Sequence, residues 1–535
     1  MEFANLRKEA YEFSSIHTSS IMDNSKICML VTIVVYLLVM VGVGIYYSHK
    51  NKNVSDFYLG GRKLGPIVTA MSAEASDMSS WLLMGLPGVA FLTGAAEAGW
   101  TAIGLAVGTY INWLIVAKRL RLYSQRCRNS ITLPDFFSNR YRDDKKILEA
   151  ISAIIILIFF VPYTASGFSA CGKLFGTLFG MEYHTAMIMS AIIIIAYTSI
   201  GGFLAASTTD LIQSIIMTFA LVVLIVFGVS KAGGMQVVME NAEGLKDYLS
   251  LNALHNPAGG ESTPFGWLPI ASTMAWGLGY FGMPHILLRF MAIEDEKKIK
   301  TSRRIATVWV VLSMAAAVLI GFIGNALSAK GTIGELNTSS EAETVVMVIA
   351  NLLSKNGVFF AILAGLIFAG ILASTMSTSD SQLLAASSSM SENLLSNVFK
   401  IKMTQKVSML VARLVLVGIA VLGVIIAWNP DSSVFRVVSF AWAGFGATFG
   451  PVMLCALFWK RSNKWGALAG MVSGGVMVFV WKFLIAPIGG IWGIYELLPA
   501  FLVALVCIIA VSLLTAAPDK EITEEFDAVN ADMKA

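Results

Sequence analysis

Long apolar stretches separated by short polar loops run along almost the whole chain. A stretch of about 20 apolar residues can cross the hydrocarbon core of a bilayer as a helix. On this criterion the pattern predicts an all-α polytopic membrane protein with thirteen transmembrane helices. The predicted spans are 28–48, 67–91, 99–117, 147–175, 184–202, 207–230, 266–288, 305–327, 357–388, 407–427, 434–458, 465–486 and 493–515.

Polar segments are predicted at both ends of the chain. Residues 1–27 form a polar N-terminal extension, and the first span, at about 20 apolar residues, is longer than a signal-peptide core. Met22 is an alternative start, which leaves open whether residues 1–21 are native. Residues 516–535 form a short acidic tail, and no soluble domain is predicted.

Basic residues are concentrated in every second loop between the predicted spans. Because basic loops stay on the cytoplasmic side, the N-terminus is expected outside the membrane and the C-terminus on the cytoplasmic side. On this pattern Arg289 belongs to a cytoplasmic loop. The basic loops lie at 49–66, 118–146, 289–304, 400–406 and 460–464.

Composition agrees with a membrane protein and excludes several other classes. The chain is 56% hydrophobic and only 13% charged, whereas soluble domains carry about 25% charged residues. Its five cysteines are scattered without metal-site or disulfide spacing. No phosphate-binding loop occurs, which argues against an ATP-driven pump. The basic cluster 118–146 indicates topology rather than nucleic-acid binding. The expected partner outside the transport site is membrane lipid, and no obligatory protein partner is expected.

One apolar span contains an unusual polar segment. The stretch "SAEASDMSSWLLMG" (72–85) holds Glu74, Asp77 and four serines. Charges at membrane depth are costly and usually functional. The flanking Gly65-Pro66 and Pro87-Gly88 pairs favour a broken helix, whose free backbone carbonyls can coordinate a cation.

A second polar segment, "ASTMSTSDSQLL" (373–384), lies late in the chain. Ser374, Ser377 and Thr378 are spaced i, i+3 and i+4, so they share one helix face. Their oxygens, set against the free carbonyls of an unwound neighbour, would form an all-oxygen site for a hard cation. In the alternative interpretation, the hydroxyls only allow close helix packing or bond to their own helix.

These segments resemble motifs of the sodium/solute symporter family. The matching stretches are "DFYLGGRKLGPIVTAMSAEASDMSSWLLMGLPG" (56–88), "WGLGYFGMPHILLRFMA" (276–292), "ILASTMSTSDSQLL" (371–384) and "WAGFGATFGPVMLCALFWKR" (442–461). The resemblance extends from about residue 28 to 515. It implies a transport core at 67–458 made of two inverted five-helix repeats, each opening with a broken helix (67–91 and 266–288). One helix (28–48) would precede this core and two (465–515) would follow it.

The resemblance also implies a sodium site. Its ligands would be the backbone carbonyls of Ala75, Met78 and Ser374 with the hydroxyls of Ser377 and Thr378. Two further residues, Asp77 and Ser79, match positions that support sodium coupling. We expect Asp77 to hold the broken helix by accepting backbone N–H groups rather than to bind the ion.

For the transported solute, the resemblance implies a pocket lined by aromatic side chains. The residues expected to line it are Tyr163, Trp276, Tyr280 and Met283. The implied function is sodium-coupled uptake of L-proline by alternating access. The alternatives are another small solute, such as a different amino acid, a sugar acid or a carboxylate, or a solute sensor. No enzymatic activity and no cofactor other than the coupling Na⁺ are expected.

A second cation or proton site is also considered on the cytoplasmic exit path. Asp210 would face Asp380 and Ser381, because two carboxylates in a low dielectric repel one another unless a positive charge lies between them. The alternative is that both carboxylates face cytoplasmic water.

Overall fold

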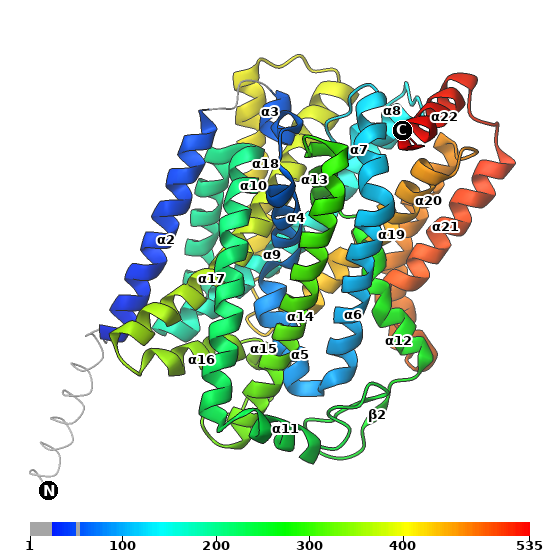
Figure 1. Cartoon of the computed structure of the whole chain (residues 1–535). Coiled ribbons are helices and arrows are strands. Elements are labelled where there is room, and N and C mark those ends of the chain that lie inside the picture. Colours follow the sequence, from blue (N-terminus) through cyan, green and yellow to red (C-terminus); the bar gives the residue numbers. More distant parts are fainter. Residues whose placement is uncertain (1–23, 50–53, 535) are drawn as a thin grey trace, which may run out of the picture.

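The computed structural model describes residues 24–49 and 54–534, so residues 1–23 of the predicted extension and residues 50–53 of the first basic loop lie outside it. In this described part, ten helices are long and apolar enough to cross a membrane (Figure 1). Their principal elements are α2 (Asn24–Ser48), α6 (Ala95–Ile111) continuing into α7 (Ala117–Arg126), α9 (Ile147–Phe179), α10 (Tyr183–Ala232), α14 (Ile299–Ala329), α17 (Val358–Ser388), α18 (Gln405–Ile426), α19 (Val434–Phe458), α20 (Lys464–Val480) and α21 (Leu497–Leu514).

Shorter elements connect these helices. They are α3 (Val54–Leu59), η1 (Gly60–Arg62), α4 (Pro66–Ser80), η2 (Trp81–Gly85), α5 (Leu86–Thr93), η3 (Asn112–Val116), α8 (Leu133–Arg140), α11 (Met235–Gly244), α12 (Trp267–Met274), η4 (Ala275–Phe281), α13 (Pro284–Ala292), η5 (Glu296–Lys298), α15 (Ser339–Ala342), α16 (Val345–Ser354), η6 (Ser389–Val398), η7 (Trp481–Ile485), η8 (Ala486–Ile488), η9 (Gly490–Trp492) and α22 (Lys520–Lys534). The expected all-helical chain also contains one small antiparallel hairpin, β1 (Ala253–Leu254) with β2 (Thr263–Pro264).

Three of the thirteen predicted spans are not among the ten long helices. The spans predicted at 67–91 and 266–288 are each divided into shorter helical pieces. The span predicted at 184–202 is the first part of α10, which bends at Gly202, where φ is 73°. An interrupted backbone leaves shorter regular helices on each side of the break. A count of helices by length therefore gives ten membrane spans and not the predicted thirteen.

The first division, between α4 and η2, depends on one residue. Ser79 has φ 47° and ψ −169°, a backbone conformation that residues other than glycine rarely adopt. Such a conformation costs about 1–3 kcal/mol and is kept only where the surroundings hold it. The chain resumes as η2 and continues without a break into α5, whose first turn contains Pro87.

The second division is spread over the 3₁₀ segment η4 and the extended residue Met283 that follows it. This irregular backbone requires glycines, because atoms of neighbouring helices occupy the space that a side chain at these positions would need. A Cβ on Gly279 would meet the indole of Trp442, and one on Gly282 would meet the carbonyl of Phe445. Pro284 then starts α13.

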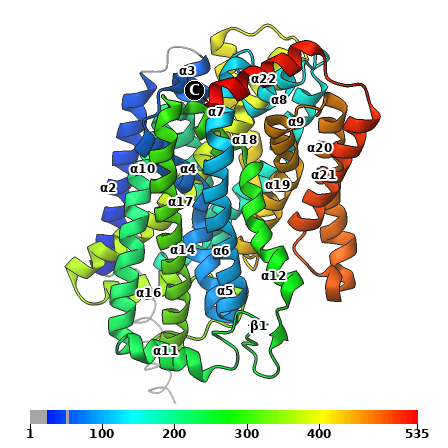
Figure 2. The ribbon, with the colours of Figure 1, turned by 45° about the vertical axis from the view of Figure 1, so that its right-hand side comes forward.

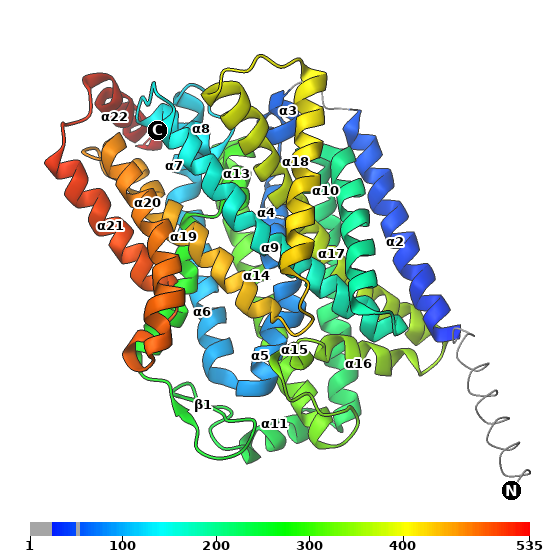
Figure 3. The ribbon, with the colours of Figure 1, turned by 180° about the vertical axis from the view of Figure 1, so that it is seen from behind.

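Helices α17 and α19 form the interior of the molecule, and others cover them. Helix α19 has the largest buried share of the ten spans, whereas α2 and α20 are among the most exposed. Helix α2 lies at one edge and α20 with α21 at the opposite edge, as Figures 1 and 3 both show. The broken helices lie between these edges, beside α17 and α19.

The predicted acidic tail contains helix α22, which packs on the same end of the molecule as α7 and α8 (Figure 2). Phe526 and Val529 are buried in this contact. Salt bridges join Arg126 to Asp532 at 2.7 Å and Arg142 to Glu521 at 2.8 Å. The acidic tail therefore neutralises part of the basic cluster from which the cytoplasmic side was predicted.

Candidate functional site

The broken helix α4 lies directly against the hydroxyl-bearing face of α17. Ser377 Oγ donates a hydrogen bond to the backbone carbonyl of Ala75, at 2.8 Å, across 302 positions of sequence. Ser377 and Ala75 are fully buried, and Thr378 is 3% exposed. The two polar segments singled out in the sequence therefore meet inside the molecule.

Ser374 contributes its carbonyl to the same cluster. This carbonyl accepts hydrogen bonds from Ser377 Oγ at 3.2 Å and from Thr378 Oγ1 at 3.1 Å. The i, i+3, i+4 spacing therefore gathers one carbonyl and two hydroxyls, and Ala75 adds a second carbonyl. All four oxygens are neutral and hard, which suits a monovalent cation such as Na⁺.

Met78 and Ser79 lie at the break itself. The N–H of Trp81 donates both to the carbonyl of Met78 and to Ser79 Oγ, the latter at 3.1 Å. Ser79 therefore caps the helical segment that follows the break. The carbonyl of Met78 keeps a second lone pair, so the bond to Trp81 does not prevent it from binding an ion.

Asp77 makes contacts different from those expected. Its carboxylate accepts a hydrogen bond from the phenol of Tyr280 at 2.6 Å, and its backbone carbonyl accepts one from Tyr163 Oη at 3.1 Å. We expected its carboxylate to accept backbone N–H groups, but Ser79 caps the break. Asp77 thus ties the first broken helix to η4 of the second and to α9.

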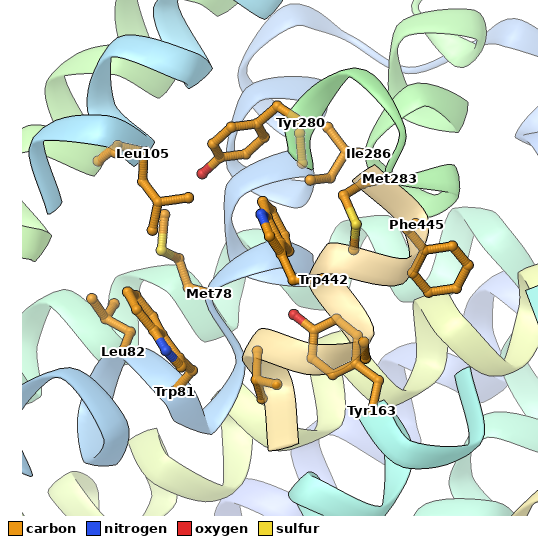
Figure 4. Close-up of a cluster of buried hydrophobic side chains, with 14 of the residues drawn as sticks. Met78, Trp81, Leu82, Leu105, Tyr163, Tyr280, Met283, Ile286, Trp442 and Phe445 are labelled. Atoms are coloured by element: carbon orange, nitrogen blue, oxygen red, sulfur yellow. The ribbon is translucent and has the colours of Figure 1, made fainter. Parts of the chain in front are cut away.

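Aromatic side chains fill the centre of the molecule beside this site. Tyr163 and Trp276 line a central cavity of about 10 Å³ with Asp77, Met78, Trp81, Leu105, Val438 and Trp442. Figure 4 shows the Trp442 ring between Tyr163 and Tyr280. The volume is only enough for about one water molecule, so the side chains are closed around the centre in this conformation.

Two of the four expected pocket residues do not line this cavity. The phenol of Tyr280 is directed to Asp77, and its ring packs edge-on against Trp442 at 5.1 Å. Met283 is fully buried beside Phe445 (Figure 4). Trp81 and Trp442 were missed, although both lie inside quoted motifs, because a tryptophan in a span usually signals ordinary packing.

Asp210, Asp380 and Ser381 lie in a buried polar cluster, not at the cytoplasmic water. Asp210 and Asp380 are 0% and 2% exposed, so the alternative in which both face water is wrong. Asp210 Oδ2 accepts hydrogen bonds from Ser72 Oγ at 2.6 Å and from Arg289 Nη2 at 3.2 Å. Asp380 Oδ1 accepts a hydrogen bond from Thr198 at 2.5 Å.

Arg289 is the residue of this cluster that the sequence did not reveal. It lies inside α13 with 1% exposure, so its assignment to a cytoplasmic loop is wrong. Its Nη2 donates to Ser381 Oγ at 2.5 Å as well as to Asp210. The guanidinium of Arg289 therefore lies beside Asp210 and Ser381, where a second cation or proton site was one of two interpretations of the sequence.

Comparison with known proteins agrees with this geometry. A profile of the sodium:solute symporter family matches residues 57–474. A sodium/proline symporter of Haemophilus influenzae is 43% identical over 509 residues, covering 93% of this chain and 97% of that protein. The high-affinity proline transporter PutP of Bacillus subtilis is 42% identical over 489 residues, covering 91% and 98% of the two chains.

Solved structures show the same fold at lower sequence identity. A substrate-bound, outward-open Na⁺-coupled sialic acid symporter superposes with a TM-score of 0.73 at 17% identity, covering 92% of this chain and 99% of that one. MhsT in complex with L-phenylalanine gives a TM-score of 0.53 at 14% identity, covering 84% and 98%. These similarities concern the fold. The match to the family profile and the identity to full-length relatives establish that the chain belongs to the sodium:solute symporter family, as its motifs predicted.

Proposed function

We propose that the protein takes up L-proline by secondary active transport, driven by the sodium gradient. The observation that carries this proposal is the contact of the Ser377 hydroxyl with the Ala75 carbonyl at the broken helix. Several relatives at about 40% identity are named as proline transporters, which favours proline among small solutes. Sodium is the coupling ion in this proposal, and proline and membrane lipid are the partners.

In this proposal one sodium ion binds between α4 and α17. Its ligands are the carbonyls of Ala75, Met78 and Ser374 and the hydroxyls of Ser377 and Thr378. Because both helices contribute ligands, the ion stabilises the conformation in which they are close. Coupling is then a linkage between two binding events, in which sodium raises the affinity for the solute and the solute raises that for sodium.

The solute binds beside the break, where Asp77 connects the two broken helices. Tyr163 and Trp276 form the wall, and opening of the Trp81 and Trp442 rings provides the room that this closed conformation lacks. Tyr280 acts through its bond to Asp77, and Met283 shapes the wall from behind. Free N–H groups at the end of a half-helix attract the carboxylate of the solute.

At the second site considered for Asp210, Asp380 and Ser381, we propose that Arg289 takes the place of a bound cation. The guanidinium of Arg289 supplies the positive charge beside Asp210. A bound ion is then not needed to neutralise this carboxylate, so we infer transport of one sodium ion per solute. The sodium dependence of uptake would then have a Hill coefficient near one, and Asp380→Ala would leave it unchanged.

The remaining architecture is part of the same proposal. The ten long helices, the two broken helices and the first part of α10 account for thirteen spans. The core 67–458 would comprise two inverted five-helix repeats, flanked by the helix at 28–48 and the pair at 465–515. The N-terminus would lie outside a bacterial cytoplasmic membrane and the acidic tail inside, because the basic loops require the cytoplasmic side.

The test is uptake of radiolabelled L-proline into proteoliposomes containing the purified full-length protein. With an inward sodium gradient we expect accumulation above equilibrium, and with potassium in place of sodium we expect none. Competition by a panel of amino acids, sugar acids and carboxylates identifies the preferred solute. Uptake that ignores sodium, or that another solute inhibits better than proline, would contradict the proposal. Binding of proline without accumulation would favour a sensor.

A further inference from the structure

A second buried carboxyl group lies on the first broken helix, and neither the proposed sodium site nor the solute wall uses it. Glu74 is 1% exposed and directly precedes Ala75. Its Oε1 accepts a hydrogen bond from the indole Nε1 of Trp113 at 3.0 Å, whereas its Oε2 makes no hydrogen bond within the described residues. A buried carboxylate with a single neutral donor is costly, so a positive charge or a proton has to accompany it.

The segment that supplies Trp113 also holds a second oxygen without a partner. Asn112 and Trp113 begin the π-helical segment η3, and such segments are frequent at functional sites. Asn112 is 1% exposed, and its Nδ2 donates to the backbone carbonyl of Tyr280 at 3.2 Å. Its Oδ1 receives no hydrogen bond from the part of the chain that the structure describes. Two consecutive residues of η3 therefore contact both broken helices.

These contacts close a cycle of polar groups around Glu74. The phenol of Tyr280 donates to Asp77 at 2.6 Å, and Asp77 lies three positions after Glu74, on the same side of α4. Together they form what we call the Glu74 cluster: Glu74, Asp77, Asn112, Trp113 and Tyr280. The cluster holds two carboxyl groups, and no basic side chain of the described residues pairs with either of them.

The other titratable groups on the elements packed against α4 are engaged elsewhere. Arg289 contacts Asp210 and Ser72, and Ser72 lies two positions before Glu74, on the opposite side of α4. The groups of this kind are Arg289 and His285 of α13, Asp210 of α10, Asp380 of α17, Tyr163 of α9, which bonds to the Asp77 carbonyl, and Arg303 of α14, which lies over the Tyr110 ring. The titratable groups that face Glu74 are therefore Asp77 and Tyr280.

The hydrogen-bond lengths distinguish the two carboxyl groups. The 2.6 Å contact from the Tyr280 phenol is in the range of a hydroxyl that donates to an ionised carboxylate, which indicates that Asp77 is ionised. The 3.0 Å contact of Glu74 has the length of a neutral hydrogen bond. A second negative charge one turn from Asp77 would be repelled in a low dielectric. A proton on Glu74 Oε2 removes this charge and turns an unpartnered acceptor into a donor.

From these observations we propose that Glu74 is a proton-binding site, which takes up one proton on Oε2 when the transporter closes around its solute. In a conformation open to water the carboxylate is hydrated and ionised, so the proton comes from that water and returns to water when the site opens again. Closure thereby links proton binding to solute binding. The inference rests on the proposed function, because the solute is what closes the site.

The experiment is calorimetric titration of L-proline into the purified full-length protein in saturating sodium. It is done at about pH 7.5, where a hydrated glutamate is ionised, in two buffers of different ionisation enthalpy, so that the difference in heat counts the protons taken up. We expect about one proton per bound proline in the wild type and none in Glu74→Gln, whose amide oxygen still accepts from Trp113. Glu261→Gln, in the exposed salt bridge with Lys246, is the control and keeps the wild-type count.

The pH dependence of proline affinity gives an independent measurement. Because the closed state holds one more proton, the Kd of the wild type should rise with pH, by up to about tenfold per pH unit between about pH 6 and pH 9, and that of Glu74→Gln should stay constant. No proton uptake by the wild type, or equal uptake by the wild type and Glu74→Gln, would overturn the proton site and leave the proposed function standing. Absence of any sodium-dependent proline binding to the wild type would instead overturn the proposed function, and this inference with it.

Discussion

The two broken helices of this protein are interrupted in different ways. Between α4 and η2 the chain departs from helical geometry at a single serine, Ser79, and the nearby backbone carbonyl of Ala75 accepts a hydrogen bond from the Ser377 hydroxyl of α17. Between α12 and α13 the interruption extends over η4 and Met283, and glycines let bulky rings approach the backbone.

The difference separates two tasks. A short break keeps the carbonyls of neighbouring residues close together, as an ion with a small coordination sphere requires. A long break spaces Trp276 and Tyr280 along the segment, where rings can line a solute path and reach Asp77 of the other broken helix. The first break thus presents main-chain atoms and the second presents side chains, so their sensitivities to substitution should differ.

The largest effect is expected at the hydroxyl that faces the first break. Ser377→Ala removes an oxygen that we propose as a sodium ligand. A hydrogen bond to a charged group contributes about 1.5–3 kcal/mol, so the sodium concentration for half-maximal uptake should rise roughly 10- to 150-fold. Sodium titration of proline uptake in proteoliposomes measures this half-maximal concentration.

A second serine on α17, Ser388, provides the control for this prediction. Ser388→Ala removes a hydroxyl that bonds only to its own helix, to the carbonyl of Ala385 at 2.9 Å. The sodium dependence of this variant should match that of the wild type. If Ser377→Ala and Ser388→Ala shift the sodium dependence equally, the hydroxyl of Ser377 is not a ligand.

The second break should be most sensitive at a glycine. Gly279→Ala places a methyl group against the indole of Trp442, whose Nε1 donates to the Trp276 carbonyl at 2.8 Å. Overpacking of this kind costs about 1–3 kcal/mol, and we expect a lower apparent unfolding temperature with reduced uptake. Thermal unfolding in detergent measures this. Gly418→Ala, in the middle of α18, where the added Cβ meets no group of another segment within 4 Å, should keep or slightly raise stability, and a loss equal to that of Gly279→Ala would contradict the steric explanation.

A smaller effect is expected for the contact that joins the two breaks. Asp77→Asn and Tyr280→Phe each remove part of the 2.6 Å hydrogen bond between these side chains. In a double-mutant cycle on proline affinity, the two substitutions should show a coupling energy of about 1 kcal/mol. Equilibrium binding of proline to the four proteins supplies the values. Additive effects would mean that the bond does not contribute to solute binding.

Much of the fold and the proposed sodium site could be predicted because their signals are local. Span lengths follow from hydrophobic runs, and the spacing of Ser374, Ser377 and Thr378 places their oxygens on one helix face. The carbonyl of Ala75 could be placed opposite them only through the family resemblance, since the contact joins positions 302 residues apart.

The errors have an equally physical origin. Counting basic residues assigns every arginine near a span end to a loop, but Arg289 pairs with Asp210, and buried pairing makes it tolerable inside the membrane. No sequence pattern relates these two residues. Likewise, the role of Trp442 depends on the path of η4, because its indole fills the space that Gly279 leaves.

The smallest predicted effect concerns the strained residue at the first break. Ser79→Ala keeps the unfavourable φ of 47° and loses the cap on the N–H of Trp81, which should lower stability by about 1 kcal/mol. Ser79→Gly also loses the cap but relieves the strain, and since glycine has a more disordered unfolded state, its stability should stay within about 0.5 kcal/mol of the wild type. Apparent unfolding temperatures in detergent would rank the two variants. If alanine proves as stable as glycine at this position, the break is held by its surroundings without strain, and the contrast between a short strained break and a long glycine-rich one loses its energetic basis.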